Sequence, residues 1–301
     1  MTTQQISTHR VARPVKPVRR SRGRGTRNGQ LTAGRGTYLL LLGIVLISLF
    51  PLYWSLVAAS GTDSSLNSSP PTLVPGPHLF ENMQKVFTDA NMTLAMVNSF
   101  LVAGTITVSV ILTSTLAGFA FAKLRFRGRG LLLGAVVATM MVPTQLGIIP
   151  LYIMMAKWFG WVDQLQALIL PGAATAFGVF FMRQYLVTAL PTELLEAARV
   201  DGCSTLRIYW NIVLPVARPA AAVLGMLTFL AAWNDFYWPL VVMTPQNPTV
   251  QVALSTLGSG YIIDYPKVLA GALVGSVPIL AVFAFLGRHI LDGIMSGAVK
   301  A

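Results

Sequence analysis

The chain has 301 residues, of which 54% are hydrophobic and only 11% are charged. Soluble domains carry about 25% charged residues, so this chain has too few charges to cover a water-facing surface. The composition therefore excludes a water-soluble globular protein and predicts a membrane protein, here with a net charge of +12.

Residues 1–37 form a basic arm that we expect to be disordered. Its stretch RRSRGRGTRNG is similar to arginine- and glycine-rich RNA-binding segments, but it lacks the aromatic residues that stack bases. We therefore expect no nucleic acid partner and interpret the arm as an anchor near anionic lipid. The arm is too long for a signal-peptide n-region, and the apolar run after it is long enough to span a bilayer.

Six apolar segments of about 20 residues predict membrane-spanning helices. They do not alternate apolar and polar residues as the strands of a membrane barrel do, so we expect an all-α polytopic membrane protein. The predicted spans are residues 38–59, 99–122, 131–155, 165–186, 219–242 and 268–290.

Proline residues interrupt several of these spans. Pro143, Pro150 and Pro278 predict kinks or breaks, because proline lacks the backbone N–H that a helix interior uses. Between the first two spans, residues 60–93 are rich in turn formers, and the stretch FENMQKVFTDANM within them predicts a short helix.

Lysine and arginine are distributed unequally between the two sides of the spans. Nineteen of the 22 lie in or next to the N-terminal arm, the loops after the second and fourth spans, and the C-terminal end. The other three are Lys85, Lys157 and Lys267. Because positive residues concentrate in cytoplasmic loops, we expect both termini and residues 190–215 to be cytoplasmic.

The motifs of catalytic and cofactor sites are missing from the sequence. It contains no Gly-Lys step, so it has no P-loop for ATP, and it has no Gly-x-Ser-x-Gly or His-Glu-x-x-His pattern. Cys203 is the single cysteine, and no Cys/His spacing indicates a metal site. We therefore expect no catalytic residues, no metal ligands and no enzyme activity in this chain.

A polar insert, residues 190–215, separates the fourth and fifth spans. Its first part predicts a helix with Thr192 as a possible cap and Glu193 in the first turn. Glu196 and Arg199 are spaced for an i, i+3 pair, and Gly202 is placed as a left-handed stop.

The second part of the insert predicts another short helix. Ser204 or Thr205 can cap its start, and Pro215 is expected to end it near Leu214. The resulting helix-turn-helix is too short to span a membrane and too apolar to remain without a partner surface. The apolar side chains expected to be exposed on this second helix are Tyr209, Trp210 and Ile212.

The segment EAARVDGCSTLRIYWNIVLP resembles the EAA loop of the membrane subunits of bacterial ABC importers. That pattern has E-A-A, three residues, G, nine residues and then I-x-L-P. In this chain it falls without a departure on Glu196, Ala197, Ala198, Gly202, Ile212, Leu214 and Pro215. The likeness extends from about residue 38 to the end, where stretches such as AAWNDFYWPLVV are similar to MalG-type permeases of carbohydrate importers.

The resemblance implies a type I ABC importer permease fold, with six transmembrane helices, a core over residues 93–290 and the EAA loop as a coupling helix-turn-helix. It implies a multi-pass subunit of the bacterial plasma membrane that binds no cofactor itself. Two cytoplasmic ATPase subunits would bind ATP and Mg, a second homologous permease would complete a heterodimer, and an extracytoplasmic binding protein would deliver a di- or oligosaccharide.

The resemblance also implies roles for particular residues. Glu196 would make a charged contact with the ATPase, Gly202 would supply the turn, and Ala197 and Ala198 would allow close helix approach. Residues 243–264 correspond to a loop inserted into the binding protein, and SGAVKA at the C-terminus corresponds to a tail between the ATPase subunits.

Asn234 and Asp235 are a polar pair within the fifth predicted span. Ionisable residues in a membrane are costly and often functional, so the pair is a pore or gate candidate, and a helix-end or packing role is the alternative. Two further alternatives stay open for the whole chain. One is an ABC importer of another solute such as glycerol phosphate, and the other is a secondary transporter that works alone.

Overall fold

The computed structural model describes the backbone of residues 34–70 and 72–298, and the side chains of these residues except Leu286 and residues 288–298. The predicted basic arm therefore lies almost wholly outside the described residues, and so do the side chains of the C-terminal SGAVKA. Within the described residues all regular structure is helical, as the sequence predicts.

The chain divides into two compact units, residues 1–50 and 51–301. Helix α1 (Arg35–Ala59) begins in the first unit and ends in the second, and it continues through Pro51. The helix is long and apolar enough to cross a membrane, which agrees with the first predicted span.

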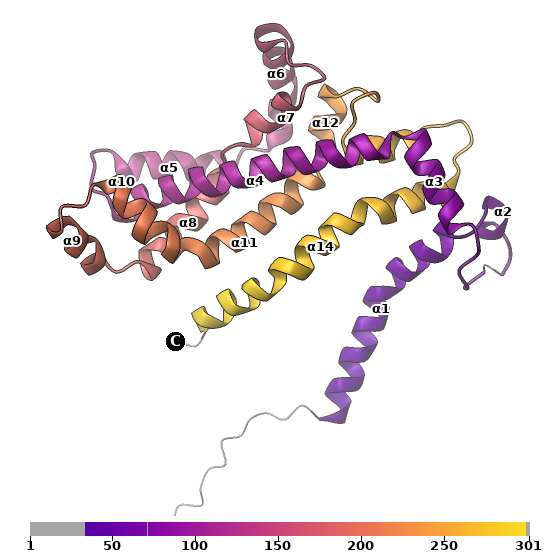
Figure 1. The fold of residues 1–301 in the computed structure, drawn as a ribbon, viewed down its shortest axis with the longest axis horizontal. Helices are drawn as coiled ribbons and strands as arrows, with labels where there is room; N and C mark the ends of the chain where they lie inside the picture. The colour runs from indigo at the N-terminus through magenta and orange to yellow at the C-terminus, as the bar shows by residue number, and fades with distance from the viewer. Residues whose placement is uncertain (1–33, 71, 299–301) are drawn as a thin grey trace, which may run out of the picture. The chain divides into compact units, whose positions relative to one another are not determined.

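The second unit holds the other helices (Figure 1). They are α2 (Asp63–Leu66), α3 (Leu79–Asp89), α4 (Met92–Lys123), α5 (Arg129–Thr139), α6 (Ile148–Ile153), α7 (Leu165–Gly172), α8 (Ala176–Ala189), α9 (Thr192–Val200), α10 (Thr205–Ile208), α11 (Leu214–Trp233), α12 (Tyr237–Val242), α13 (Val250–Leu257) and α14 (Tyr265–Ala298). Shorter 3₁₀ or π segments cover Thr144–Gly147, Met154–Phe159 and Tyr209–Val213.

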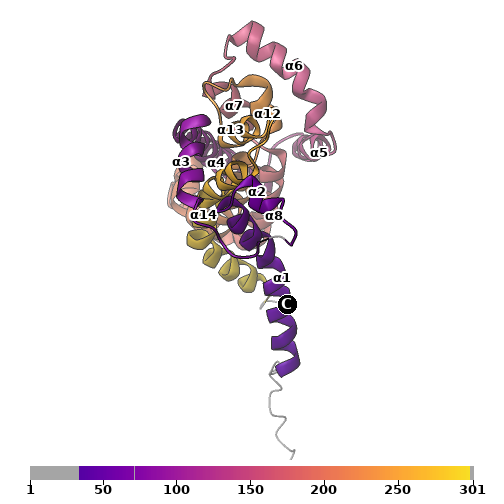
Figure 2. The same cartoon turned by 90° about the vertical axis from the view of Figure 1, so that its right-hand side faces the viewer.

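The long helix α4 lies at the centre of the second unit, alongside α8 and α11 (Figures 1 and 2). One hydrophobic cluster, the loop-end cluster, joins α4 to α8, α9 and α11, and another, the far-end cluster, joins it to α3, α13 and α14. Buried members of the loop-end cluster include Val110, Met182, Leu195, Tyr209 and Leu224. Buried members of the far-end cluster include Val86, Ala103, Trp233, Val250 and Ala270.

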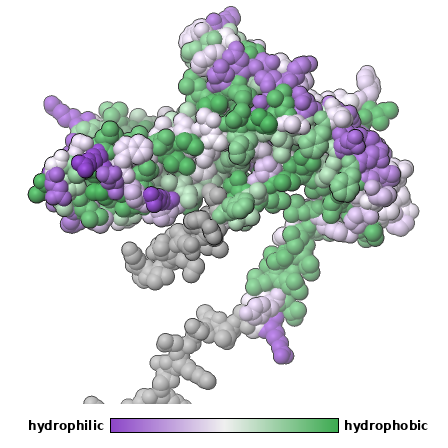
Figure 3. Space-filling model, viewed as in Figure 1, coloured by the Kyte–Doolittle hydropathy of each residue, from purple (hydrophilic) through white to green (hydrophobic). Residues whose placement is uncertain are grey.

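Hydrophilic residues gather over α9–α10, over α2–α3 and on the projection that carries α6 and α7, and the surface of the long helices between these regions is mostly apolar (Figure 3). The apolar surface includes Phe100 and Val108 of α4 and Leu280 of α14, each more than half exposed. An apolar belt between polar regions is what a bilayer or a second membrane subunit requires.

The third predicted span, residues 131–155, is wrong as a single straight helix. Within the described residues, five helices are long and apolar enough to cross a membrane, and a sixth crossing needs α5 and Thr144–Phe159 together, which meet at 89°. The break falls just before Pro143, whose ring disfavours helix at the residue before it and which has no N–H to donate. Pro278, in contrast, lies inside α14, which continues through it.

The fifth predicted span, residues 219–242, is displaced. The continuous apolar helix runs over Thr205–Trp233, and a break separates it from α12. Asn234 ends α11 as its C-cap, because its side chain can bond to the backbone in place of a further helical turn.

The predicted short helix after residue 60 is confirmed as α3. Its side chains bond to the end of α1 and to α14. The buried Asn82 amide donates to the carbonyls of Ala59 at 2.9 Å and Gly61 at 3.1 Å. At the end of α3, the Lys267 ammonium lies 3.0 Å from the Asp89 carboxylate and lowers the pKa of that carboxyl. The pair therefore stabilises the fold at neutral pH, and this contribution is lost as the pH falls through the lowered pKa.

The close approach of α4 to α8 depends on Gly118. A Cβ at this position would lie 2.8 Å from the Cβ of Met182 and 2.9 Å from the backbone nitrogen of Arg183. Gly104, on the same helix, has no heavy atom within 4 Å of the corresponding point.

We expect Gly118→Ala to lower the free energy of unfolding by about 1–3 kcal/mol, the usual cost of overpacking. Gly104→Ala is the matched control, since it gains about 1 kcal/mol of helix propensity without a clash. Thermal unfolding of the detergent-purified protein measures both variants. Equal midpoints for the two would contradict a packed α4–α8 contact.

Candidate functional site

The insert between α8 and α11 begins at a buried anchor. Leu190 is 1% exposed and belongs to the loop-end cluster. Pro191, in extended conformation, takes the N-cap position of α9, so the predicted cap Thr192 is instead the first helical residue. Proline fits this position because its missing N–H and fixed φ cost nothing at the start of a helix.

Helix α9 presents the E-A-A residues on two faces. Leu195 and Ala198 are buried against the loop-end cluster, whereas Glu196 and Ala197 are exposed. The predicted ion pair between Glu196 and Arg199 is wrong, since no such pair is present in the described part of the chain. Glu196 is therefore exposed and without a charged partner among the described residues.

Gly202 ends α9, as the sequence predicts. Its φ is +75°, a left-handed value that glycine adopts without strain. Its N–H donates to the carbonyl of Arg199 at 3.0 Å, and the N–H of Cys203 donates to that of Ala198 at 2.9 Å. These two bonds form a Schellman motif, which satisfies the last carbonyls of the helix.

Ser204 caps the second helix, as expected: its Oγ accepts from the backbone N–H of Arg207 at 3.3 Å. Pro215 does not end this helix, and that prediction is wrong. A π turn over Tyr209–Val213 precedes the proline, in which the N–H of Leu214 donates to the carbonyl of Tyr209. The wider turn absorbs the proline, and the helix runs on into α11 as one span from Thr205 to Trp233.

Tyr209 was expected to be exposed, and it is instead only 1% exposed. Its hydroxyl lies 2.7 Å from the Thr115 hydroxyl of α4, and its ring lies beside that of Phe119. The second helix of the insert is therefore joined directly to the central helix of the bundle.

Four large apolar side chains of the insert are exposed, and we call this set the loop's apolar face. It consists of Leu194, Val200, Leu206 and Trp210, with exposed fractions of 47%, 88%, 63% and 50%. The remaining motif residues Ile212, Leu214 and Pro215 are half-buried at the start of α11. The site thus combines a free carboxylate and large apolar side chains on one rigid two-helix element.

At the other end of α11, two tryptophans hold the break before α12. The indole N–H of Trp233 donates to the carbonyl of Gly275 at 3.0 Å, and that of Trp238 donates to Ala167 at 2.9 Å. Asn234 donates to the carbonyl of Leu230 at 2.9 Å. Asp235 lies between these anchors and is exposed.

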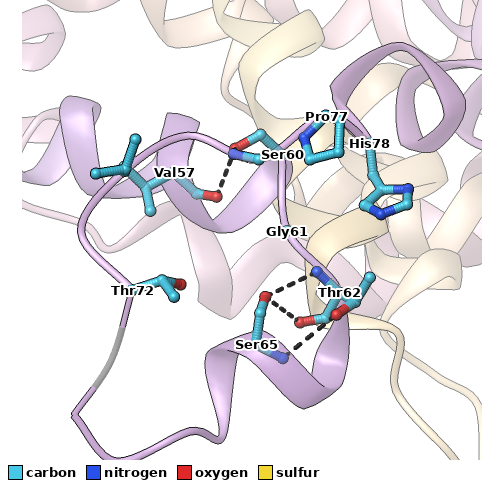
Figure 4. Close-up of a pocket in the computed structure, with 10 residues that line it drawn as sticks. Val57, Ser60, Gly61, Thr62, Ser65, Thr72, Pro77 and His78 are labelled. Carbon is cyan, nitrogen blue, oxygen red and sulfur yellow. Dashed lines mark hydrogen bonds between the residues drawn. The ribbon is translucent and has the colours of Figure 1, made fainter.

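A small hollow of about 200 Å³ lies where α1 leads into α2 (Figure 4). Its hydroxyl groups bond to the surrounding loop. The Ser60 hydroxyl donates to the carbonyl of Val57 at 2.7 Å, and the Thr62 and Ser65 side chains form a reciprocal capping box. These groups hold the loop together and are not aimed at a ligand.

Acidic residues, histidine and cysteine do not gather elsewhere in the described residues into a group of three that could hold a metal ion.

Comparisons with known proteins decide the family. Residues 110–292 match the family described as "Binding-protein-dependent transport system inner membrane component". The chain belongs to this family. It is thus a permease component of a binding-protein-dependent ABC importer, a multi-pass protein of the inner membrane, and such components transport solutes rather than catalyse reactions.

Curated relatives extend the match beyond that segment. The sn-glycerol-3-phosphate transport system permease protein UgpE of Yersinia pestis is 35% identical over 268 residues, covering 85% of this chain and 94% of the relative. UgpE of Salmonella typhimurium is 35% identical over 267 residues with the same coverage.

Solved structures show the same fold. A chain of a bacterial ABC transporter that imports the acidic polysaccharide alginate has a TM-score of 0.73 and 22% identity, covering 85% of this chain and 98% of that one. A chain of the bacterial alginate transporter in complex with its pentasaccharide-bound periplasmic protein has a TM-score of 0.59 and 16% identity, covering 83% and 92%. The predicted type I importer permease fold is confirmed.

Sequence reasoning missed the groups that hold these sites in place. Thr115 is about 90 residues before its partner Tyr209, and the carbonyl partners of Trp233 and Trp238 lie on α14 and α7. The paired tryptophans in AAWNDFYWPLVV were a usable signal, because an indole N–H in a membrane bundle needs an acceptor.

The left-handed turn at Gly202 gives a direct prediction. An alanine Cβ would meet no heavy atom within 4 Å, so Gly202→Ala adds only the strain of a positive φ, about 1–2 kcal/mol. We expect amide hydrogen exchange over the end of α9 to quicken about tenfold. Gly128→Ala is the control, since Gly128 has a φ of +80° and equally open surroundings outside the insert; a similar quickening of α9 in that variant would contradict the assignment.

Proposed function

We propose that this chain is the permease of an ATP-driven importer of a sugar, with residues 190–215 as the element that receives the ATPase. The observation that carries the proposal is the outward side of the insert, where Glu196 and the loop's apolar face stand on helices anchored in the bundle. Exposed apolar side chains on a rigid element favour a protein partner. The chain has no P-loop, so ATP and Mg would be bound by that partner.

The anchoring explains how movement would pass from the ATPase into the membrane. Leu195 and Ala198 hold α9 to the loop-end cluster, and Tyr209 holds the following turn to Thr115 of α4. Beyond Tyr209 the chain continues without a break into α11. A displacement of the insert would therefore shift α4 and α11 together, as a rigid element with two positions does.

The charge distribution supports a membrane orientation in which the insert faces the cytoplasm. Nineteen of 22 lysines and arginines occur in or next to the N-terminal arm, the loops after the second and fourth predicted spans, and the C-terminal end, and this distribution favours a cytoplasmic position for the insert and for both termini. The binding protein would then meet the opposite end, within residues 243–264. Part of that segment folds back as α13, and its tip presents Tyr261 and Ile262, which are fully exposed and 90% exposed.

A second permease would cover the apolar belt. Phe100, Val108 and Leu280 are exposed there, and the bent pair of α5 with Thr144–Phe159 exposes Leu131, Leu146 and Ile149, each by more than 70%. A homologous subunit would cover these exposed apolar side chains, and lipid would cover those that remain.

The relatives favour a polyhydroxylated solute. UgpE belongs to an sn-glycerol-3-phosphate transport system and the solved transporter imports alginate, and both of these solutes are polyhydroxylated. A glycerol phosphate importer is the second candidate, favoured by the 35% identity to UgpE. A transporter that works alone is less well supported, since residues 131–155 and 165–186 contain no acidic residue for ion coupling.

The ATPase contact can be tested by charge reversal. We expect Glu196→Lys to reduce the amount of ATPase that co-purifies with the chain about tenfold, because one buried charge contact at an interface is worth roughly 1.5–3 kcal/mol. Glu193→Lys is the matched control, an exposed acid on the same helix. Quantitative pull-down from membranes that express all subunits measures both.

Equal loss of ATPase in the two variants would indicate a general effect of charge and contradict a specific role for Glu196. Uptake by the purified chain alone in proteoliposomes, without ATP, would refute the importer proposal altogether.

A further inference from the structure

The break between α11 and α12 is a fixed feature of the fold. Its two flanking tryptophans, Trp233 and Trp238, are bonded to α14 and α7 respectively. Asn234 uses its amide N–H on the carbonyl of Leu230, and its side-chain carbonyl lies 3.4 Å from the amide nitrogen of Gln251. Asn234 is therefore a helix cap, and it is not available to a solute.

Asp235 and Tyr237 are exposed, as Asn234 is, and Tyr237 is 66% exposed. No charged side chain of the described residues pairs with Asp235, and the backbone amides of Phe236 and Trp238 interact with its carboxylate. The anchors on either side hold these two side chains outside both hydrophobic clusters.

Two of the three lysines assigned to this end are paired with acidic side chains: Lys85 lies 2.8 Å from Glu81 and Lys267 lies 3.0 Å from Asp89. The third, Lys157, is exposed and forms no ion pair within the described residues. A phosphate or carboxylate usually needs an arginine, a lysine or several N–H donors. Asp235 itself would repel such a group.

A break in a membrane helix is tolerated where it is buried in protein or lines a water-filled cavity, and broken helices of transporters form their solute sites. We propose that Asp235 and Tyr237 contact the solute at the outer mouth of its path, and that this contact selects an uncharged, polyhydroxylated solute. The inference rests on the proposed function, since a solute path exists only in a translocating permease.

The chemistry of the two side chains fits a sugar. A carboxylate accepts hydrogen bonds from two neighbouring hydroxyls, and these charge-assisted bonds are about twice as strong as neutral ones. The ring of Tyr237 offers an apolar face for the C–H side of a sugar ring and a hydroxyl at its edge. For an anionic solute such as glycerol phosphate, the favourable energy of the hydroxyl contact would be offset by repulsion between its negative charge and the Asp235 carboxylate.

The test uses the complete importer in proteoliposomes: this chain with its partner permease, its ATPase and its binding protein. Initial uptake of radiolabelled maltose, trehalose, cellobiose, raffinose and sn-glycerol 3-phosphate is measured beside ATP hydrolysis. We expect uptake of at least one neutral sugar and none of glycerol 3-phosphate. In Asp235→Asn we expect the sugar moved per ATP to fall about tenfold, with hydrolysis changed by less than about twofold, because the charge-assisted bonds are lost.

Two variants separate a solute contact from a structural effect. Asp235→Glu keeps the charge, and we expect it to retain at least about a third of the uptake. Glu81→Gln removes another exposed carboxylate from the same end, and we expect wild-type uptake. Transport of glycerol 3-phosphate, no uptake of any neutral sugar, wild-type uptake by Asp235→Asn, or an equal loss in Glu81→Gln would each overturn the inference.

These outcomes can be told apart from failure of the proposed function. An unmodified complex that forms but does not hydrolyse ATP in response to the loaded binding protein would overturn the proposed function and this inference with it. Normal hydrolysis with any of the contrary uptake results would overturn the inference alone.

Discussion

Every buried backbone N–H and C=O needs a hydrogen-bond partner, and the arrangement of this chain follows from how it meets that requirement where its helices end or change pitch. The last carbonyls of α9 are satisfied by the Schellman bonds at Gly202. The π turn before Pro215 supplies a bond from Leu214 to Tyr209, so a proline is accommodated without ending the helix. Asn234 caps α11 with its own side chain. Gly202 and Asn234 lie where their helices end, whereas the π turn lets its helix continue into α11.

The packing of α4 connects these helix ends and turns to the rest of the bundle. Gly118 brings it against α8, and the Tyr209–Thr115 contact joins it to the insert. Side chains at this density cannot absorb a displacement by local adjustment, so a push on the insert would be transmitted along α4 and α11. The opposite end of α11 carries the anchored break at Asn234 and Asp235, which places the two candidate sites at the two ends of one helix.

The sequence predicted what depends on local composition and spacing. Four of six spans, the short helix α3, the turn at Gly202 and the Ser204 cap follow from hydrophobicity and capping chemistry over a few residues, and all are present. The errors share a cause. Pro215, Tyr209 and the 89° bend after α5 depend on groups distant in the chain or on a rare π turn, and no local rule contains that information. The motif spacing identifies Glu196 but does not show which residue of another protein it contacts. Its role in binding the ATPase therefore stays a prediction.

The E-A-A spacing makes physical sense once the faces of α9 are known. Successive helical residues are about 100° apart, so three in a row cannot share a face. Ala198 packs inward, and Glu196 and Ala197 point outward. The geometry of the insert is fixed by Leu195, Gly202 and Tyr209, none of which depends on the Glu196 carboxylate. Glu196 therefore makes no contact that the fold requires, and it lies on a helix that the fold holds in place. Its charge is free to interact with another protein.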